Sequence, residues 1–311
     1  MPVRTLSGDV DPASLGRCLA HVHLLGTPQE NNDKPDLTLR DRARAAEEMV
    51  RLGQAGVGAV VEMGPWDFED HELADLLELE RVSGVAFVAV AGARNGQIAA
   101  PQVRDASVEE LAERACREFA GEANGGIPVG ALKAGTGVGE VSELDRKLIE
   151  AIGLAHRRTG APVLTHSEHG ALAREQVEEL ERAGVDPARM AIGHTDRAGT
   201  AVQLAVLERG AYLVLDQIGK FKYLVADDYR DLIAAILDAG HGDRLMLSSD
   251  FGRCSYLRAY GGSPGLDYLV REFLDEMVDR GIPPAALEKM LVDNPARFLS
   301  HDGGGPGGNQ G

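Results

Sequence analysis

The chain has 311 residues, of which 44% are hydrophobic and 26% are charged, an ordinary balance for a globular protein. Its formal net charge of −17 at pH 7 argues against nucleic acid as a partner, because phosphate binding requires a basic surface. The three cysteines, Cys18, Cys116 and Cys254, are odd in number and form no close pair, which argues against a disulfide framework and favours a reducing compartment.

The beginning of the chain, MPVRTLSGDV, lacks the apolar core of a signal peptide. No apolar run approaches the ~18 residues that a membrane-spanning helix requires. We therefore predict a cytoplasmic protein that has no membrane partner and no nucleic-acid partner. A small molecule is the expected ligand.

Short segments rich in β-branched residues alternate with longer amphipathic segments along nearly the whole chain. The short segments predict strands at residues 18–24, 57–63, 85–91, 129–133, 163–166, 190–194, 211–215 and 245–250. The longer segments predict helices, for example at residues 39–52, 108–119, 143–158, 171–183 and 229–239. Strands that alternate with helices indicate an α/β fold with a parallel sheet. This number of strands favours a closed (β/α)8 TIM barrel over the alternative, a doubly wound open sheet.

The C-terminal part of the chain, residues 264–300, predicts additional helices, the last of which opens at Asn294-Pro295. Proline is suited to a helix start because its missing N–H has no partner there. Residues 303–311 begin with Gly-Gly-Gly-Pro-Gly-Gly and are predicted to be a disordered, Gly-rich tail. Because no linker interrupts the rest, residues 1–302 are expected to form a single domain.

Two histidines, His21 and His23, lie at the end of the first predicted strand. A spacing of two residues on a strand places both imidazoles on one face, so both can point into the mouth of a barrel. Imidazoles are good ligands for zinc and neighbouring metals. Alone, this H-x-H pattern is equally compatible with two buried histidines that pack in the core.

Four more predicted strands, the fourth, fifth, sixth and eighth, end in Lys133, His166, His194 and Asp250. In barrel enzymes, the carboxyl ends of several strands together form the active site. Buried polar groups are unfavourable without partners, so core packing does not explain five strands that end in this way. The joint pattern therefore indicates a metal site.

This ordered set of H-x-H, Lys, His, His and Asp resembles the metal ligands of the phosphotriesterase-like branch of the amidohydrolase superfamily. The resemblance extends from AHVH at 20–23 to NPARFL at 294–299, and IGH at 192–194 and LD at 215–216 match strand ends of the family. It implies a barrel that binds two divalent metal ions. Zinc is the expected metal, with manganese, cobalt and iron as alternatives. Relatives are often dimers, so a homodimer is compatible with the resemblance.

The resemblance also implies a role for each ligand. His21, His23 and Asp250 would bind the more buried ion, and His166 and His194 would bind the more exposed one.

Lys133 would be N-carboxylated so that its carbamate bridges both ions, since a free ammonium cannot bind a metal. Two such ions can share a hydroxide, and they lower the pKa of its parent water toward neutrality. This bridging hydroxide would attack the substrate, and Asp250 would accept its proton.

The substrate class is narrowed by two positions in the loops. In relatives that hydrolyse organophosphates, a His and a second Asp continue a proton relay from the strand-eight aspartate; here these positions are Gln217 and Arg197. Neither side chain shuttles a proton at neutral pH, which argues against efficient phosphotriester hydrolysis. Lactone hydrolysis does not require the relay, because the leaving alkoxide stays attached and Asp250 can protonate it. The acyl-homoserine lactone group has an aromatic residue after strand three, where this chain has Arg94.

Cationic residues gather in the predicted mouth loops: Arg94, Lys220, Lys222 and Arg253. In an acidic protein this cluster favours a substrate with an anionic group. We therefore predict a lactonase, or a related carboxylic ester hydrolase, that acts on a small polar lactone, phosphorylated or not. The alternative is that these cations are solvated or pair with Asp216, Asp227 and Asp228.

Three other interpretations are retained. They are a phosphotriester (organophosphate) hydrolase, a mononuclear amidohydrolase such as a deaminase in which Lys133 binds no metal, and a barrel without catalytic activity. The chain has no Gly-x-Ser-x-Gly elbow directly between a predicted strand and a helix, and no P-loop or Rossmann glycine motif in a suitable context. His169 is interpreted as an exposed loop residue, with a contact to His166 as the alternative.

Overall fold

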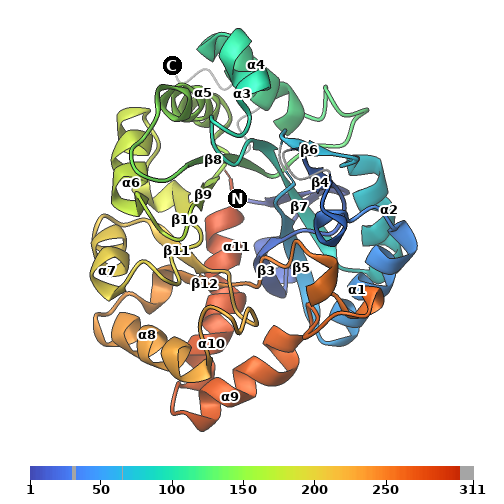
Figure 1. Ribbon diagram of the computed structural model, residues 1–311, viewed down its shortest axis with the longest axis vertical. Helices are drawn as coiled ribbons and strands as arrows, with labels where there is room; N and C mark the ends of the chain where they lie inside the picture. The colour runs from blue at the N-terminus through green and yellow to red at the C-terminus, as the bar shows by residue number, and fades with distance from the viewer. Residues whose placement is uncertain (30–32, 65, 302–311) are drawn as a thin grey trace.

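Each of the predicted strand segments forms a strand of one parallel sheet. A computed structural model describes residues 1–29, 33–64 and 66–301 of the chain. The strands are β3 (Arg17–Val22), β5 (Val57–Glu62), β7 (Ala86–Gly92), β8 (Ala131–Thr136), β9 (Val163–Ser167), β10 (Met190–Ile192), β11 (Tyr212–Leu215) and β12 (Leu245–Leu247). They pair in the order β12-β11-β10-β9-β8-β7-β5-β3, so neighbours in the chain are neighbours in the sheet. Figure 1 shows these strands as a ring surrounded by helices, which confirms the predicted (β/α)8 barrel.

The first and last strands of the sheet meet through side-chain and loop contacts instead of a regular ladder. The backbone N–H of His21 donates to Ser248 Oγ at 2.9 Å, and this hydroxyl donates to His21 O at 2.5 Å. The backbone N–H of Asp250 donates to His21 O at 3.1 Å. These bonds close the ring between β3 and β12 next to two of the predicted metal ligands.

Helices cover the outside of the ring, and the five predicted examples are confirmed within a few residues at each end. The helices around the ring are α1 (Arg42–Gln54), α2 (Leu73–Ser83), α3 (Ala100–Asp105), α4 (Val108–Phe119), α5 (Glu143–Thr159), α6 (Ala173–Arg182), α7 (Thr200–Glu208) and α8 (Ala226–Asp238), and the five predicted examples correspond to α1, α4, α5, α6 and α8. The bounds of α4 match the prediction because Ser107 and Glu110 form a capping box that fixes its start. None of the helices among the described residues is both long enough and apolar enough to cross a membrane.

The C-terminal segment is helical, as predicted. It comprises one π-helical turn (Leu269–Phe273), α9 (Leu274–Asp279), α10 (Pro284–Leu291) and α11 (Asp293–Leu299). Short 3-10 turns occur at Pro12–Ser14, Pro35–Leu37, Pro187–Arg189, Gly242–Arg244, Cys254–Tyr256 and Arg258–Tyr260. The predicted Gly-rich tail, residues 303–311, lies outside the described residues.

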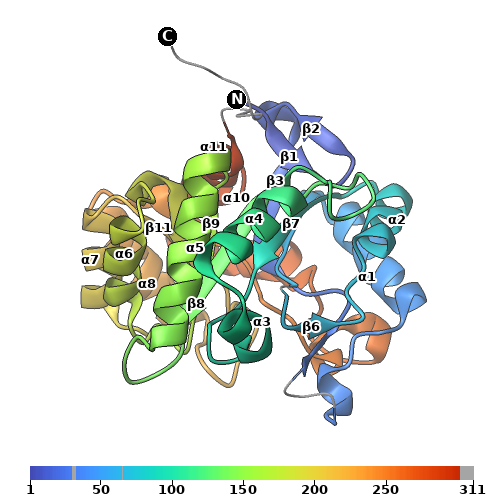
Figure 2. The same cartoon turned by 90° about the horizontal axis from the view of Figure 1, so that it is seen from above.

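Two small antiparallel ribbons, which the sequence patterns did not predict, lie on the barrel. One is the hairpin β1 (Val3–Thr5) and β2 (Gly8–Val10), and the other pairs β4 (Thr27–Pro28) with β6 (Phe68–Glu69). Figure 2 shows the hairpin at the opposite end of the view from β6. The β4–β6 ribbon therefore lies near the end of the barrel at which the strands finish.

The core has two layers. One apolar cluster draws a residue from every strand and so fills the inside of the ring; it includes Ala20, Val61 and Val214. The other lies between the sheet and the helices and includes Leu19 and Val22. Along β3, Ala20 points inward and Val22 outward, which breaks the regular alternation. The register against β5 shifts between Leu19 and Val22, so a β-bulge re-aims the intervening His21.

Candidate metal centre

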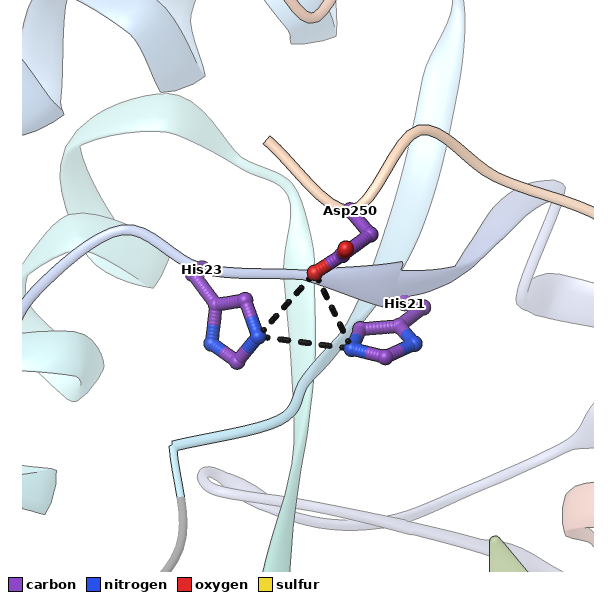
Figure 3. Close-up of side chains that lie close together, drawn as sticks. All are labelled: His21, His23 and Asp250. Carbon is purple, nitrogen blue, oxygen red and sulfur yellow. Dashed lines mark hydrogen bonds and ion pairs between the residues drawn. The ribbon is translucent and has the colours of Figure 1, made fainter. Parts of the chain in front are cut away.

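The first group of converging side chains comes from the two ends of the sheet. His21 is on β3, His23 follows it, and Asp250 follows β12. Nε2 of His21 lies 3.3 Å from Nε2 of His23, and both nitrogens lie 3.3 Å from Asp250 Oδ1 (Figure 3). Both histidines are buried, with 2% and 6% of their surface exposed. The three atoms form a compact, shielded set of ligands.

The protonation state of His21 leaves one ring nitrogen available to a cation. Its Nδ1–H donates to Asp216 Oδ2 at 2.8 Å, so its Nε2 presents a lone pair. Burial lowers the pKa of His21 to about 4, against the opposing effect of Asp250, and the ring is neutral at pH 7. This lone pair faces His23 Nε2 and Asp250 Oδ1, so either a proton of His23 or a metal cation can lie between the three atoms. The donor set, two imidazoles and one carboxylate, suits zinc and its neighbours.

The second group is formed by His166 of β9 and His194, which follows β10. His166 Nδ1 lies 3.0 Å from His194 Nε2. The other nitrogen of each ring has an acceptor: His194 Nδ1–H donates to Asp216 Oδ1 at 2.8 Å, and His166 Nε2–H donates to Glu168 Oε1 at 3.1 Å. Burial lowers the pKa of His166 to about 3, so this ring is also neutral. Asp216 and Asp250 raise the pKa of His194 against the effect of burial, so either a proton on His194 Nε2 or a metal ion can occupy the position between the two facing nitrogens.

Asp216 orients one histidine of each group. It is fully buried at the end of β11, and the hydrogen bonds from His21 and His194, together with their charge, hold its pKa well below the usual range although burial alone would raise it. The loop N–H groups of Asp216 and Gln217 in turn donate to Asp196. Sequence reasoning noted Asp216 as a family match and as a candidate ion-pair partner but did not assign it this role.

Lys133 of β8 is fully buried, and its amine donates to the carbonyl oxygen of Met63 at 2.8 Å. Burial lowers its pKa to about 8. Burial is also the main reason for the lowered pKa values of His23 and His166, and the charge of Lys133 adds to both effects. The amine is therefore electrostatically coupled to one histidine of each group.

Two predicted ligands lie just beyond the strands to which the sequence patterns assigned them. β10 ends at Ile192 and β12 at Leu247, so His194 and Asp250 are loop residues. Both have left-handed backbones, with φ of 57° and 45°. Such conformations cost about 1–3 kcal/mol and concentrate at functional sites. The chain therefore bends at both candidate ligands instead of continuing as an extended strand.

A cavity of about 200 Å³ opens beside the two groups. Its walls include His23, His166, His194 and Asp250 together with all four predicted substrate-binding residues. The alternative that these cations pair with Asp216, Asp227 or Asp228 is wrong for the part of the chain that the structure describes. Arg94 pairs with Asp67 at 2.5 Å and Arg253 with Asp36 at 3.4 Å, whereas Lys220 contacts Asp250.

Lys222 is held by aromatic rings. Its Nζ lies 4.7 Å from the ring centre of Tyr223 and 5.9 Å from that of Tyr256. Tyr223 also contacts Arg197, one of the two relay positions, whose guanidinium carbon lies 3.9 Å from the centre of the same ring. His169 is exposed and contacts Arg197, as expected for a loop residue. Gln217, the second relay position, lines the cavity.

The family model of the phosphotriesterase family matches residues 1–299. The chain belongs to this family. The resemblance inferred from the ligand pattern is thereby confirmed, and the chain is a metal-dependent hydrolase that acts on ester bonds.

Several phosphotriesterase-family members are similar to this chain. The phosphotriesterase homology protein of Escherichia coli is 33% identical over 91% of this chain and 98% of its own length. Its solved structure, complexed with phosphate in the active site, has a TM-score of 0.87 at 30% identity and covers 92% of this chain and 99% of that one. A lactonase from Listeria monocytogenes has a TM-score of 0.91 at 26% identity, covering 97% and 100%. A phospho-furanose lactonase of Mycoplasmopsis synoviae is 31% identical over 56% of this chain and 51% of its length.

Proposed function

We propose that this phosphotriesterase-family chain is a binuclear lactonase. His21, His23 and Asp250 would hold one divalent ion, and His166 and His194 would hold the second. The observation that carries the proposal is the pair of converging imidazole groups, whose nitrogens lie 3.3 Å and 3.0 Å apart and in each of which Asp216 orients one ring. When bound, two ions would supply an activated water and polarise the scissile carbonyl. Zinc is the proposed metal, with manganese, cobalt or iron as alternatives.

Lys133 would complete the centre as a carbamate shared by the two ions. A pKa of about 8 keeps part of the amine neutral near pH 8, and only the neutral amine reacts with CO2. Lys133 lies on β8, which pairs with β9. In this register His166 of β9 is opposite Gly135, two residues after Lys133. Among the described residues, the carbonyl oxygen of Met63 is the one hydrogen-bond acceptor of this buried amine, which leaves it available for carboxylation.

The substrate proposed is a small lactone that carries an anionic group such as phosphate. Lys222 and Arg253 line the cavity at its exposed side, together with Tyr256. Phosphate in the active site of the Escherichia coli relative and the name of the phospho-furanose lactonase support this choice. Asp250 would take the proton of the attacking water and return it to the leaving oxygen of the opened lactone.

A panel of substrates tests the proposal. Zinc- or manganese-loaded protein is offered phosphorylated and neutral lactones, organophosphate triesters and N-acyl amides, and hydrolysis is followed by proton release or product analysis. We expect the phosphorylated lactones to be hydrolysed with the highest kcat/KM. Arg253→Met should lower kcat/KM on them at least tenfold more than on neutral lactones. Activity confined to triesters or amides would contradict the proposal.

A further inference from the structure

We propose that Lys220 is a catalytic residue that donates a hydrogen bond to the leaving oxygen as the ester C–O bond breaks. The sequence pattern grouped Lys220 with Lys222 and Arg253 as cations for an anionic substrate. The structure separates Lys220 from the other two cations, because its ammonium donates a hydrogen bond to Asp250, one of the proposed metal ligands. The inference depends on the proposed lactonase function.

The two oxygens of Asp250 have different partners. Oδ1 faces Nε2 of His21 and of His23, each at 3.3 Å, whereas Oδ2 receives the hydrogen bond from Lys220 Nζ. The Lys220 side chain is only 8% exposed and yet lines the cavity. A buried ammonium in this position reaches the same face of the centre as the carboxylate that handles the proton.

The ammonium of Lys220 has unused donors. It carries three N–H groups, and among the residues that the structure describes Asp250 is its one hydrogen-bond acceptor. Buried donors without partners are unfavourable, so a ligand or water in the cavity is expected to accept the other two. A substrate oxygen placed beside Asp250 would be such an acceptor.

The backbone holds Lys220 in place. Its N–H donates to Gln217 O at 3.0 Å, and its carbonyl oxygen accepts from the N–H of Tyr223 at 2.8 Å. The preceding Gly219 has φ of 89°, and a Cβ there would lie 2.7 Å from the ring of Phe251. This glycine lets the turn approach the Asp250–Phe251 segment closely, which brings the lysine onto the carboxylate.

A ground-state anion is a poor ligand for this ammonium. Asp250 already neutralises the charge of Lys220, and its own negative charge would repel a phosphate or carboxylate placed alongside. A charge that develops only during the reaction is different, because preorganised donors act most strongly on it. The leaving alkoxide of a lactone is such a charge.

In the proposed reaction, one water molecule is added across the ester bond of the lactone. The water oxygen forms a bond to the carbonyl carbon, and the bond from that carbon to the ring oxygen breaks. The proton of the water passes to Asp250 and then to the leaving oxygen, giving a hydroxy acid. Lys220 stays an ammonium throughout, and its N–H holds the leaving oxygen while that oxygen is negative.

The test compares a lactone with the thiolactone of the same skeleton. Thiols ionise near pH ~8.5 and water near ~15.7, so a leaving thiolate needs far less stabilisation than a leaving alkoxide. We expect Lys220→Met to lower kcat about 100-fold or more on the lactone, in the range seen for lost transition-state donors, and less than about tenfold on the thiolactone. Lys220→Arg should restore part of the lactone rate. KM and the metal content should change less than about twofold.

Lys289→Met is the matched control, because this lysine of α10, with 37% of its side chain exposed, pairs with Asp243 and does not line the cavity, so the variant should have wild-type kinetics. An equal loss of kcat on lactone and thiolactone, loss of bound metal, or wild-type kcat on the lactone in Lys220→Met would each overturn the inference. If the wild-type protein hydrolyses neither compound, the proposed lactonase function itself fails, and the two failures are distinguished.

Discussion

At the scale of single residues, hydrogen-bonding partners decide which histidine nitrogens face the proposed ion positions. Asp216 accepts Nδ1–H of both His21 and His194, and Glu168 accepts Nε2–H of His166. Each carboxylate fixes the tautomer that leaves a lone pair for a metal. The buried Asp216 therefore couples the two proposed ion positions.

Replacing Asp216 with Asn should weaken metal binding about 10- to 100-fold, the usual effect of losing an orienting partner. The amide keeps the size of the carboxylate but has one oxygen, so it cannot accept from both imidazoles. Competition with a chelator, followed by metal analysis, measures the change. Asp227→Asn is the control, since Asp227 is exposed and pairs with Arg280. Equal metal retention in both variants would contradict this role for Asp216.

Lys133 gives a pH dependence of metal loading. Burial lowers its pKa to about 8, so below pH 8 the amine is an ammonium that cannot react with CO2. The neutral fraction rises about tenfold per pH unit up to that value. Reconstitution of metal-free protein at a constant concentration of dissolved CO2 should therefore accelerate as the pH rises from 6.5 to 8 and level off above. A rate that does not depend on pH at constant CO2, or does not depend on the CO2 concentration, would argue against carboxylation.

At the scale of elements, the ends of the sheet determine how the first metal group forms. The bulge in β3 turns His21 toward the mouth, and Ser248 joins β12 to β3. The H-x-H spacing predicted that both imidazoles share one face of a regular strand. The structure reaches a similar outcome through an irregular strand, because His23 lies beyond the end of β3.

Ser248→Ala should lower the free energy of unfolding by about 1–3 kcal/mol, because it leaves the buried N–H of His21 without an acceptor. The measurement is urea denaturation of the metal-free protein, so that metal binding does not contribute. Ser14→Ala removes an exposed hydroxyl that donates to Asp11 O and should change stability by less than about 0.5 kcal/mol. If Ser248→Ala lowers the free energy of unfolding by less than about 0.5 kcal/mol, the contact between β3 and β12 does not depend on this hydroxyl.

The strands and the long helices could be predicted because local patterns encode them. β-branched runs mark the buried strands, and Ser107 with Glu110 marks the start of α4. The ribbon of β4 and β6 could not be predicted, since two-residue strands carry no periodicity. The left-handed bends at His194 and Asp250 were also invisible, because their cause lies in the surrounding structure.

At the scale of the whole molecule, the predicted ligands converge because the carboxyl ends of parallel strands meet at one rim. Their partners could not be predicted in the same way. Arg253 is 217 residues from Asp36, and His21 is 195 residues from Asp216, so only the folded barrel brings these pairs together. The acidic chain of net charge −17 thus contains a cavity with cationic walls. The homodimer and the cytoplasmic location stay predictions.

The count of bound ions tests the central claim most directly. Protein purified in zinc and bicarbonate is analysed by plasma mass spectrometry beside His166→Ala. We predict two ions per chain in the wild-type protein and one in the variant, because His21, His23 and Asp250 remain intact there. A single ion in the wild-type protein, or an unchanged count in His166→Ala, would contradict a binuclear centre.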